Sequence, residues 1–365
     1  MQGFLVMSYL KGGGEPMPSC NGSRRKFLQG VGALGVVAAT APYVKTSHSA
    51  GKLAIGTWDH WVPGANDVLR EVCEEWAGSN GVDLTIDFIT SIGNKLLLTA
   101  QAESRAETGH DVYCVPQWMP SMFRHRLEPV DDVVNDIISA HGSLNPAADF
   151  FAHLDGVWRG APAPAGSLSY PSVSRLDLYR EHAGIDLTSI FPAGGARNHE
   201  LVDAWSYDSF LTAAQKLYAV GKPFGAPIAP TPDGNQWLGS LFAAYGAEVM
   251  DASGDITVDS DEIREVLEYL SRLTQFMPDS VYAWDDASNN RFMISGSGST
   301  AFNPPSIWAV SSRDMPAVAE QLWHHDSPRG PKGRYRASAP FFWGIWDFSS
   351  NISAGKDLLR YLARK

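Results

Sequence analysis

Short apolar segments alternate with amphipathic segments through most of the chain, and this alternation predicts an α/β protein. Residues 53–58, 84–89 and 111–116 have the length and apolar content of buried strands. Residues 66–79 and 94–105 carry apolar side chains at helical spacing. The order strand, helix, strand, helix, strand is that of a βαβαβ unit in a mostly parallel sheet, which binds ligands at the carboxyl ends of its strands.

A second set of alternating elements follows and predicts a second α/β lobe. A connection rich in Pro, Gly, Lys and Arg, residues 324–336, is expected to be exposed before the final strand and helix. The predicted elements of this part are a strand-helix element over 176–183, helices over 207–220, 236–245 and 261–275, strands over 223–228, 298–303 and 341–346, and helices from 307 and from 354.

The first 49 residues have the pattern of an export signal. A basic segment at residues 23–28, with Arg24 and Arg25 adjacent, precedes an uncharged stretch at 30–41 and small residues at 47–50. The uncharged stretch is too short to span a membrane. We therefore expect a signal peptide over residues 1–49, export by the twin-arginine route and a periplasmic location; an ordinary N-terminal helix is the alternative reading.

Composition and charge narrow the class of partner. A chain of 365 residues with 44% hydrophobic content is long enough for two domains. Its net charge of −11 becomes −15 without residues 1–49, because that segment holds five basic residues and one acidic residue. An acidic surface disfavours nucleic acid as a partner.

Cysteine, histidine and carboxylate positions give no catalytic or metal motif. Cys20 falls within the predicted signal, while Cys73 and Cys114 form either a disulfide or two buried free thiols. Pairs such as Asp59 with His60 or Asp285 with Asp286 stand without a nucleophile elbow, a zinc motif or a phosphate loop. The sequence predicts a binding protein without turnover, without a cofactor and without a metal; His324-His325-Asp326 is a weak metal candidate in a solvated loop.

Aromatic and polar residues gather where the first predicted strands end. The segment Trp58-Asp59-His60-Trp61 follows the first strand, and Trp118 follows the third. Because the carboxyl ends of parallel strands meet at one edge, these side chains are expected to share one rim. Trp76, Trp158 and Trp205 are expected to be packing residues instead.

Four segments in register resemble the extracellular solute-binding proteins, family 1, of sugar ABC importers, relatives of maltose-binding protein. The resemblance runs from about Leu53 to Lys365. The segments are Asp155-Gly156 to Ala161-Pro162, Leu178-Tyr179-Arg180 with Ala183-Gly184-Ile185, Ala204-Trp205-Ser206-Tyr207-Asp208-Ser209-Phe210, and Gly296 to Asn303 with Trp308.

The resemblance implies a type 2 periplasmic-binding-protein fold, with two α/β lobes, hinge crossings and a cleft between the lobes. It places residues 50–161 and 337–365 in a discontinuous N-terminal lobe and residues 162–336 in a C-terminal lobe. Family members continue for several dozen residues past the position of Lys365, so the resemblance also implies a C-terminal lobe without its usual final helices.

The implied function is capture of a small solute, first of all a carbohydrate, by hinge closure of a monomer and its delivery to an ABC transporter membrane permease. Sugar sites combine aromatic faces with planar polar groups that pair with hydroxyls. Weaker candidates are Trp284, Asp285 and Trp343. The predicted ligand-binding residues are Trp58, Asp59, His60, Trp61, Trp118, Asp233, Asn235, Gln236, Trp237, Asn303 and Trp308.

Two alternatives stay open at this stage. The same fold serves binders of non-sugar solutes such as polyamines, iron or phosphorylated polyols, and Arg124, Arg126 and Arg291 could serve an anionic ligand. A secreted carbohydrate-active enzyme would also be acidic and rich in tryptophan, and would need two carboxylates about 5 to 10 Å apart.

Overall fold

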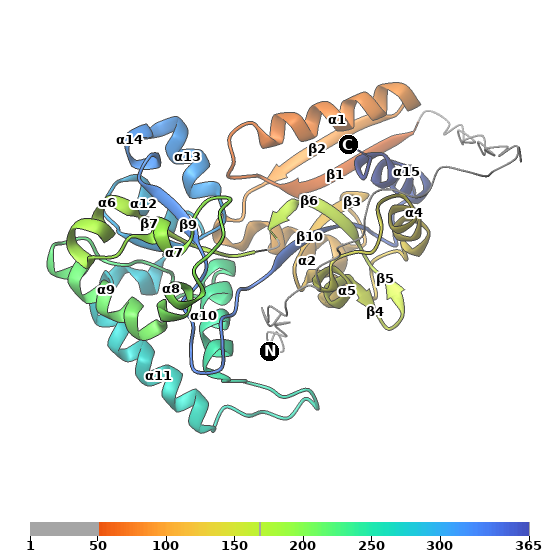
Figure 1. Cartoon of the computed structure of the whole chain (residues 1–365). Coiled ribbons are helices and arrows are strands. Elements are labelled where there is room, and N and C mark those ends of the chain that lie inside the picture. Colours follow the sequence, from red (N-terminus) through yellow and green to blue (C-terminus); the bar gives the residue numbers. More distant parts are fainter. Residues whose placement is uncertain (1–50, 168, 365) are drawn as a thin grey trace, which may run out of the picture.

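The computed structural model describes residues 51–167 and 169–364. These residues form two main β-sheets, each packed with helices (Figure 1). The predicted signal peptide, with its arginine pair and Cys20, lies outside the described residues. Among the described helices, none has both the length and the apolar content that a membrane crossing needs.

The first sheet has five strands in the order β2-β1-β3-β10-β6. Strand β1 runs parallel to β2 and β3, which confirms the predicted βαβαβ unit. Strand β10 comes from near the end of the chain and lies antiparallel between β3 and β6. The strands are β1 Lys52–Trp58, β2 Asp83–Ile89, β3 Val112–Pro116, β6 Ala161–Ser167 and β10 Ala339–Ile345.

Helices cover this sheet, and contacts between them join the beginning and the end of the described chain. Helix α1 is bounded by Gly64 and Gly81, which both adopt the left-handed conformation that suits glycine. Its buried Trp76 donates from Nε1 to Oδ2 of Asp357 in α15 at 3.0 Å. The elements around the sheet are α1 Ala65–Asn80, η1 Ile92–Asn94, α2 Lys95–Ala106, α3 Met119–Met122, α4 Asp131–His141, α5 Pro146–Ala152, the hairpin β4 His153–Leu154 and β5 Val157–Trp158, and α15 Ile352–Leu362.

The second sheet has three strands in the order β8-β7-β9, and both pairings are antiparallel. The prediction of mostly parallel sheets is therefore wrong for this half of the chain. The strands come from segments far apart in sequence, so no local βαβ unit fixes their direction. They are β7 Ser172–Arg175, β8 Thr300–Phe302 and β9 Leu322–His325.

The strand predicted over residues 223–228 does not form. Only Phe224 makes a bridge, to Thr300 of β8. Pro223 and Pro227 have no N–H to donate, so this segment cannot continue a ladder.

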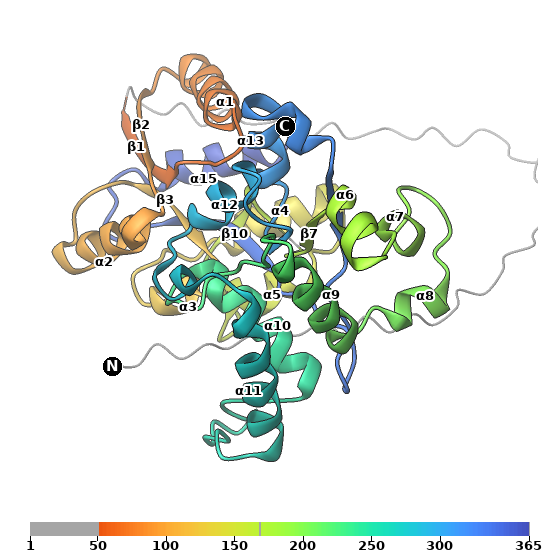
Figure 2. The same cartoon turned by 90° about the vertical axis from the view of Figure 1, so that its left-hand side faces the viewer.

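Helices α10 and α11 of this second group lie side by side (Figures 1 and 2). Its helical elements are α6 Leu176–Leu178, η2 Tyr179–Ala183, α7 Leu187–Ile190, α8 His199–Ala204, α9 Tyr207–Ala219, α10 Pro232–Tyr245, α11 Asp261–Leu273, η3 Thr274–Phe276, η4 Asp279–Ala283, α12 Ser288–Ile294, α13 Ser306–Asp314 and α14 Pro316–Ala319.

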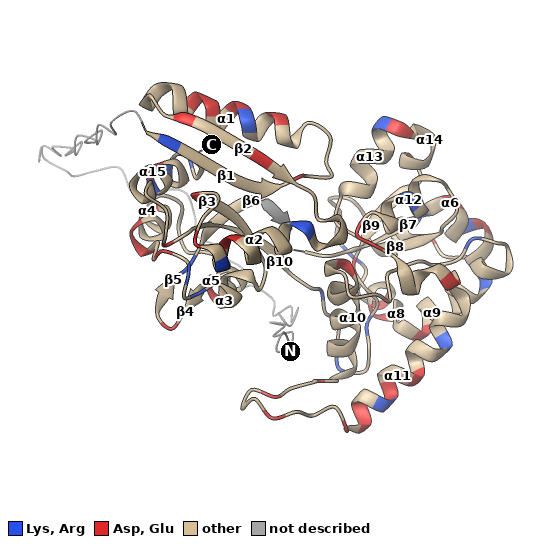
Figure 3. Ribbon diagram, turned by 180° about the vertical axis from the view of Figure 1, so that it is seen from behind, with Lys and Arg blue, Asp and Glu red and all other residues tan. Residues whose placement is uncertain are grey.

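Charged residues are spread along outer helices such as α1 and α11 (Figure 3). One basic residue joins two helices of the first group: Arg360 of α15 contacts Asp132 and Asp136 of α4 at 2.7 and 2.6 Å. Such exposed pairs contribute about 0 to 1 kcal/mol each. They orient α15 on α4 more than they stabilise the fold.

A partly buried charge network lies beside the first sheet. His110 contacts Oε1 of Glu103 through Nδ1 at 2.5 Å and Oδ2 of Asp87 through Nε2 at 3.0 Å. Trp346 donates from Nε1 to Oε2 of Glu103 at 3.0 Å. Burial alone would lower the pKa of His110, but hydrogen bonds and charge from the two carboxylates outweigh it and raise that pKa.

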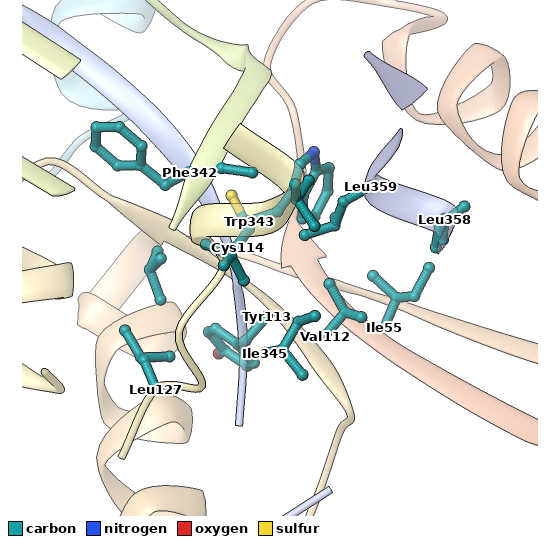
Figure 4. Close-up of a cluster of buried hydrophobic side chains, with 14 of the residues drawn as sticks. Ile55, Val112, Tyr113, Cys114, Leu127, Phe342, Trp343, Ile345, Leu358 and Leu359 are labelled. Carbon is teal, nitrogen blue, oxygen red and sulfur yellow. The ribbon is translucent and has the colours of Figure 1, made fainter. Parts of the chain in front are cut away.

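Hydrophobic side chains form a separate core around each sheet. The first core draws on residues 53–161 and 342–359, and Figure 4 shows Trp343 and Phe342 of β10 within it. The main second core draws on residues 170–337, and a smaller cluster lies beside it. The two segments that connect the cores are themselves joined, because the N–H of Tyr170 donates to the carbonyl of Ala337 at 3.0 Å.

Candidate functional site

Aromatic side chains of the first group gather at the end of β1. The ring of Trp58, at the end of β1, lies 5.1 Å from that of Phe341 in β10 and 4.6 Å from that of His60. Trp58 is half-buried, and its Nε1 is buried without a hydrogen-bond partner among the described residues. This buried N–H group can therefore donate a hydrogen bond to a bound molecule, because no acceptor among the described residues pairs with it.

The two polar residues next to Trp58 also shape the loop before α1. Asp59 accepts a hydrogen bond from Nδ2 of Asn66 at 2.7 Å, and the N–H of His60 donates to Oδ1 of the same asparagine at 3.0 Å. Nδ1 of His60 accepts from the N–H of Val62 at 2.9 Å. Their position beside Trp58 is therefore set by local hydrogen bonds.

The second group contributes a buried set of polar side chains around Asp233. This residue lies in the first turn of α10, which begins at the N-cap Thr231; the Thr231 hydroxyl accepts from Gly234 N–H at 3.0 Å. Nδ2 of Asn289 donates to Oδ2 of Asp233 at 2.5 Å.

The cluster continues to the end of β8. Asn303 and Asn289 are 3% and 0% exposed, so each must satisfy its amide within the protein. The Ser306 hydroxyl donates to Oδ1 of Asn303 at 2.7 Å. Asn303 was predicted as a ligand residue, and the structure places it beside Asp233.

Two carboxyl groups of this cluster have raised pKa values. Burial raises the pKa of Asp233 to about 7, with a further contribution from the charge of Asp286, although hydrogen bonding by Tyr170, Asn289 and Asn303 opposes the shift. Burial likewise raises the pKa of Asp286 to about 6. Neither carboxylate makes an ion pair within the described residues.

Ser91 brings the first group against the second at Asp286. Its hydroxyl lies beside the Asp286 carboxyl and lowers that pKa, against the larger effect of burial. Ser91 Oγ and Asp286 Oδ1 are nevertheless buried without a hydrogen bond of normal geometry among the described residues. Trp58 Nε1, at the end of β1, is a further buried polar atom without a partner among the described residues. Unsatisfied buried polar atoms cost free energy unless a bound molecule pairs with them.

Several predicted residues lie elsewhere. Trp237 is 1% exposed, stacks on Phe302 at 5.6 Å and donates from Nε1 to the carbonyl of Pro227 at 2.8 Å, so it is a core residue. Gln236 is also buried, whereas Asn235 on the same helix is half-buried. In α10 only part of the helix surface faces outward, so three consecutive residues cannot all reach one ligand.

The remaining predicted aromatics are more exposed. Trp308 on α13 is 50% exposed, and Trp61 and Trp118 are half-buried. Of the weaker candidates, Trp284 is buried against Phe292, and Trp343 is 2% exposed within the first core.

Sequence reasoning missed four residues of the junction: Tyr170, Ser91, Asn289 and Ser306. Asn289 and its neighbour Asn290 gave one signal, because adjacent asparagines are poor helix formers yet lie in α12. Tyr170 and Ser91 gave no signal, since their role depends on contacts with distant segments.

The pair His324-His325 is not in a solvated loop, as predicted, but in β9. His325 is buried, with Nε2 2.9 Å from Ser174 Oγ and Nδ1 3.0 Å from the carbonyl of Asp326. Burial lowers the pKa of His325 to about 4. Within the described ranges, no group of three His, Cys, Asp or Glu side chains is arranged to hold a metal ion.

Of the two alternatives for Cys73 and Cys114, the structure has two buried free thiols. Burial raises the pKa of each thiol to about 12. Both are therefore packing residues of the first core.

A hollow of about 800 Å³ lies apart from this junction, in the second group between α9, α10, α11 and the loop at residues 329–331. None of the predicted ligand residues lines it. Its wall includes the buried Tyr207 and the charged residues Asp208, Glu265, Glu268, Arg272 and Arg329.

Comparisons with known proteins identify the fold. No protein-family model matches the chain, and no curated protein matches it by sequence. The maltose-bound protein MalE3 of T. maritima superposes with a TM-score of 0.70 at 19% identity, over 86% of this chain and 77% of that one.

Two further solved structures have the same fold. An ABC transporter solute-binding protein from Thermotoga lettingae, bound to α-D-tagatose, has a TM-score of 0.67 at 14% identity, over 86% and 77% of the two chains. A sugar transporter protein from Arthrobacter chlorophenolicus, with bound laminaribiose, has a TM-score of 0.66 at 16% identity, over 86% and 76%. The likeness confirms the predicted periplasmic-binding-protein fold.

Proposed function

We propose that this chain is the periplasmic substrate-binding component of an ABC importer. It captures a small solute, foremost a carbohydrate, between two lobes and delivers it to a membrane permease. The observation that carries the proposal is the approach of Ser91, from the first group, to Asp286 of the second, next to the polar cluster around Asp233, in a fold shared with proteins solved with maltose, tagatose and laminaribiose.

The chemistry of the junction supports a carbohydrate. Trp58 and Phe341 offer ring faces to the C–H groups of a sugar ring. Asp233 is partly exposed and offers a carboxyl group that pairs with hydroxyls, which would be costly to bury unpaired; the buried amide of Asn289 holds it in place. An apolar surface with a few fixed polar groups is the usual composition of a small-molecule site.

The two cores support hinge closure as the mechanism. We assign residues 51–167 and 339–364 to one lobe, because β6 and β10 pair within the first sheet, and residues 170–337 to the other, because Tyr170 and Ala337 belong to the second core. The hinge is then formed by the two connections that meet at Tyr170 and Ala337, and not by Ala161-Pro162, which lies inside β6. The contact between Tyr170 and Ala337 keeps these connections together while the lobes rotate. We propose a monomer that reaches the periplasm through the twin-arginine route.

Thermal unfolding in the presence of sugars tests the proposal. A ligand that binds only the native state raises the melting temperature in a saturable way. We expect a rise with at least one mono- or disaccharide or polyol, which is lost in Trp58→Ala and reduced in Trp58→Phe, because phenylalanine keeps a ring face but lacks the Nε1–H donor. Tyr282→Ala is the matched control, because Tyr282 is 59% exposed. If no sugar or polyol moves the melting temperature, the carbohydrate proposal is wrong.

The same samples distinguish binding from catalysis. Asp233 and Asp286 have raised pKa values, as general acids of glycosidases do, so an enzyme is the rival hypothesis. We propose binding without turnover. Chromatography of di- and trisaccharides after long incubation should show only the starting sugar, and a product that disappears in Asp286→Asn would favour the enzyme.

A further inference from the structure

The two connections between the lobes meet the second lobe at buried residues. Strand β6 of the first lobe ends at Ser167, and β10 begins at Ala339. The adjoining residues Tyr170 and Ala337 are both buried in the second core. The N–H of Tyr170 donates to the carbonyl of Ala337 at 3.0 Å, which holds the two crossings together. A hinge bends at only a few residues, so the groups that hold its crossings decide where the lobes pivot.

The side chain of Tyr170 fixes the first crossing to the end of β8. Its hydroxyl donates to the carbonyl of Phe302 at 3.0 Å within the second core. The next residue adds a backbone bond, because the N–H of Asn303 donates to the carbonyl of Pro171 at 3.1 Å. A buried hydroxyl without an acceptor costs free energy, so the bond to Phe302 favours one position of the Tyr170 side chain.

The carbonyl that accepts from Tyr170 is also linked to Asp233. Nδ2 of Asn289 donates to the carbonyl of Phe302 at 3.4 Å and to Oδ2 of Asp233 at 2.5 Å. One amide group can serve both acceptors, because it has two donor hydrogens. Oδ1 of Asn289 accepts from the N–H of Asn290 at 2.7 Å, so the whole amide is engaged. The acceptor of Tyr170 and the carboxyl of Asp233 are therefore held by the same buried side chain.

Helix α10 holds the second crossing. The Ser240 hydroxyl accepts from the N–H of Ala337 at 2.9 Å and donates to the carbonyl of Gln236, one turn earlier, at 3.0 Å. Serine is a poorer helix former than alanine, but here its buried hydroxyl satisfies a backbone N–H that belongs to the hinge. Asp233 lies in the first turn of the same helix. The second crossing and Asp233 are thus attached to one rigid element.

We propose that Tyr170 and Ser240 are positioning residues that anchor both crossings of the hinge on the part of the second lobe that carries Asp233. The pivot then keeps a fixed place relative to the polar cluster, and closure brings the first lobe onto a bound solute along one path. Without the anchors the lobes sample more orientations, and more of the binding free energy is needed to order them. This inference rests on the proposed function, because it links solute capture to closure.

The distance between the lobes in the protein without solute tests the anchors. Spin labels on Val68→Cys in α1 and Leu267→Cys in α11 report this distance by double electron–electron resonance; the two native side chains are 60% and 51% exposed. The native Cys73 and Cys114 are buried and stay unlabelled. In the otherwise unchanged chain we expect a narrow distribution of distances.

Substitutions of the two anchors should widen this distribution. Tyr170→Phe and Ser240→Ala should each broaden it, because each releases one crossing, and the double variant should broaden it further. Tyr269→Phe is the matched control, since the buried Tyr269 hydroxyl also donates to a backbone carbonyl, that of Tyr207, at 2.8 Å. Tyr269→Phe should lower the melting temperature about as much as Tyr170→Phe and leave the distribution of distances unchanged.

Sugars test the link between capture and closure. Maltose, tagatose and laminaribiose, which occupy proteins of the same fold, are the first probes, followed by any sugar or polyol that raises the melting temperature. A sugar that binds should shorten the distance between the labels. Tyr170→Phe and Ser240→Ala should each weaken its binding about fivefold or more, whereas Tyr269→Phe should not.

The measurement without solute separates this inference from the proposed function. If Tyr170→Phe or Ser240→Ala leaves the distribution unchanged, or if Tyr269→Phe broadens it equally, the anchor inference is wrong and the carbohydrate proposal stands. If one anchor variant does not fold, the other decides. If both anchor variants broaden the distribution and no sugar or polyol binds, the anchors are supported and the carbohydrate proposal is wrong. A bound sugar whose affinity is the same in both anchor variants would also overturn the inference.

Discussion

Replacing Asp286 with asparagine should stabilise this protein at neutral pH, although it removes a group of the proposed site. The side chain of Asp286 is half-buried and has no positive partner among the described residues. Asparagine has nearly the same shape and can still hydrogen-bond, but it brings no charge to be desolvated. A binding site commonly sacrifices stability in this way.

The magnitude follows from the pKa of the carboxyl. Burial raises the pKa of Asp286 from 3.8 to about 6, and each unit corresponds to about 1.4 kcal/mol. The ionised group therefore destabilises the native state by up to about 3 kcal/mol, and partial solvent exposure reduces this to about 1 to 3 kcal/mol. We expect Asp286→Asn to raise the free energy of unfolding by that amount at pH 8.

The sign depends on pH. The native state holds the Asp286 proton more tightly than the unfolded state does, so wild-type stability falls as pH rises from about 4 to about 6 and stays reduced above that range. At pH 4 the carboxyl is protonated in the native state, and the gain from asparagine should shrink below about 1 kcal/mol.

Urea unfolding followed by tryptophan fluorescence at pH 8 and pH 4 measures both values. Asp285→Asn is the matched control. Burial alone would raise the pKa of Asp285, but hydrogen bonds from Ser288 and Arg291 lower it overall, so its removal should destabilise the protein at pH 8. If Asp286→Asn destabilises the protein at pH 8, or if its effect is the same at pH 4, the reasoning is wrong.

Three further predictions concern the two cores. His110→Gln should lower the free energy of unfolding by about 2 kcal/mol at pH 6 and by less at pH 9. The pKa of His110 is raised in the native state, so its stabilising effect is complete below about pH 6.5 and is lost as the pH rises through the native-state pKa. Urea unfolding curves at several pH values check this. Trp237→Ala should cost about 3 to 5 kcal/mol by the same assay, since it empties a buried site. Cys73 and Cys114 should react with a thiol reagent only at the rate of unfolding; fast labelling of the native protein would contradict their burial.

The sequence alone determined the elements whose signal is local. The first three strands and the helices between them appear where hydrophobic periodicity places them, because buried faces require that spacing whatever the partner is. The strand expected near residues 341–346 also forms, as β10. The resemblance in four segments led to the fold that the structural comparisons confirm.

The tertiary structure decided how these elements combine. Periodicity gives no strand direction, so the antiparallel place of β10 between β3 and β6, and the antiparallel second sheet, could not be derived. Residues 223–228 have the apolar content of a strand, but their prolines prevent a ladder.

The candidate site divides in the same way. Residue type and position beyond a strand or at a helix start identified Trp58, Asp233 and Asn303 as candidates; the structure brings Asp233 and Asn303 together and places Trp58 against Phe341, and their role in ligand binding stays a prediction. Trp237 was expected there as well, yet it lies in the core, because only packing shows which side of α10 is buried. Ser91 and Asp286, which lie close together, come from different lobes. A charge without a partner is a property of that three-dimensional neighbourhood, and no pattern along the chain encodes it.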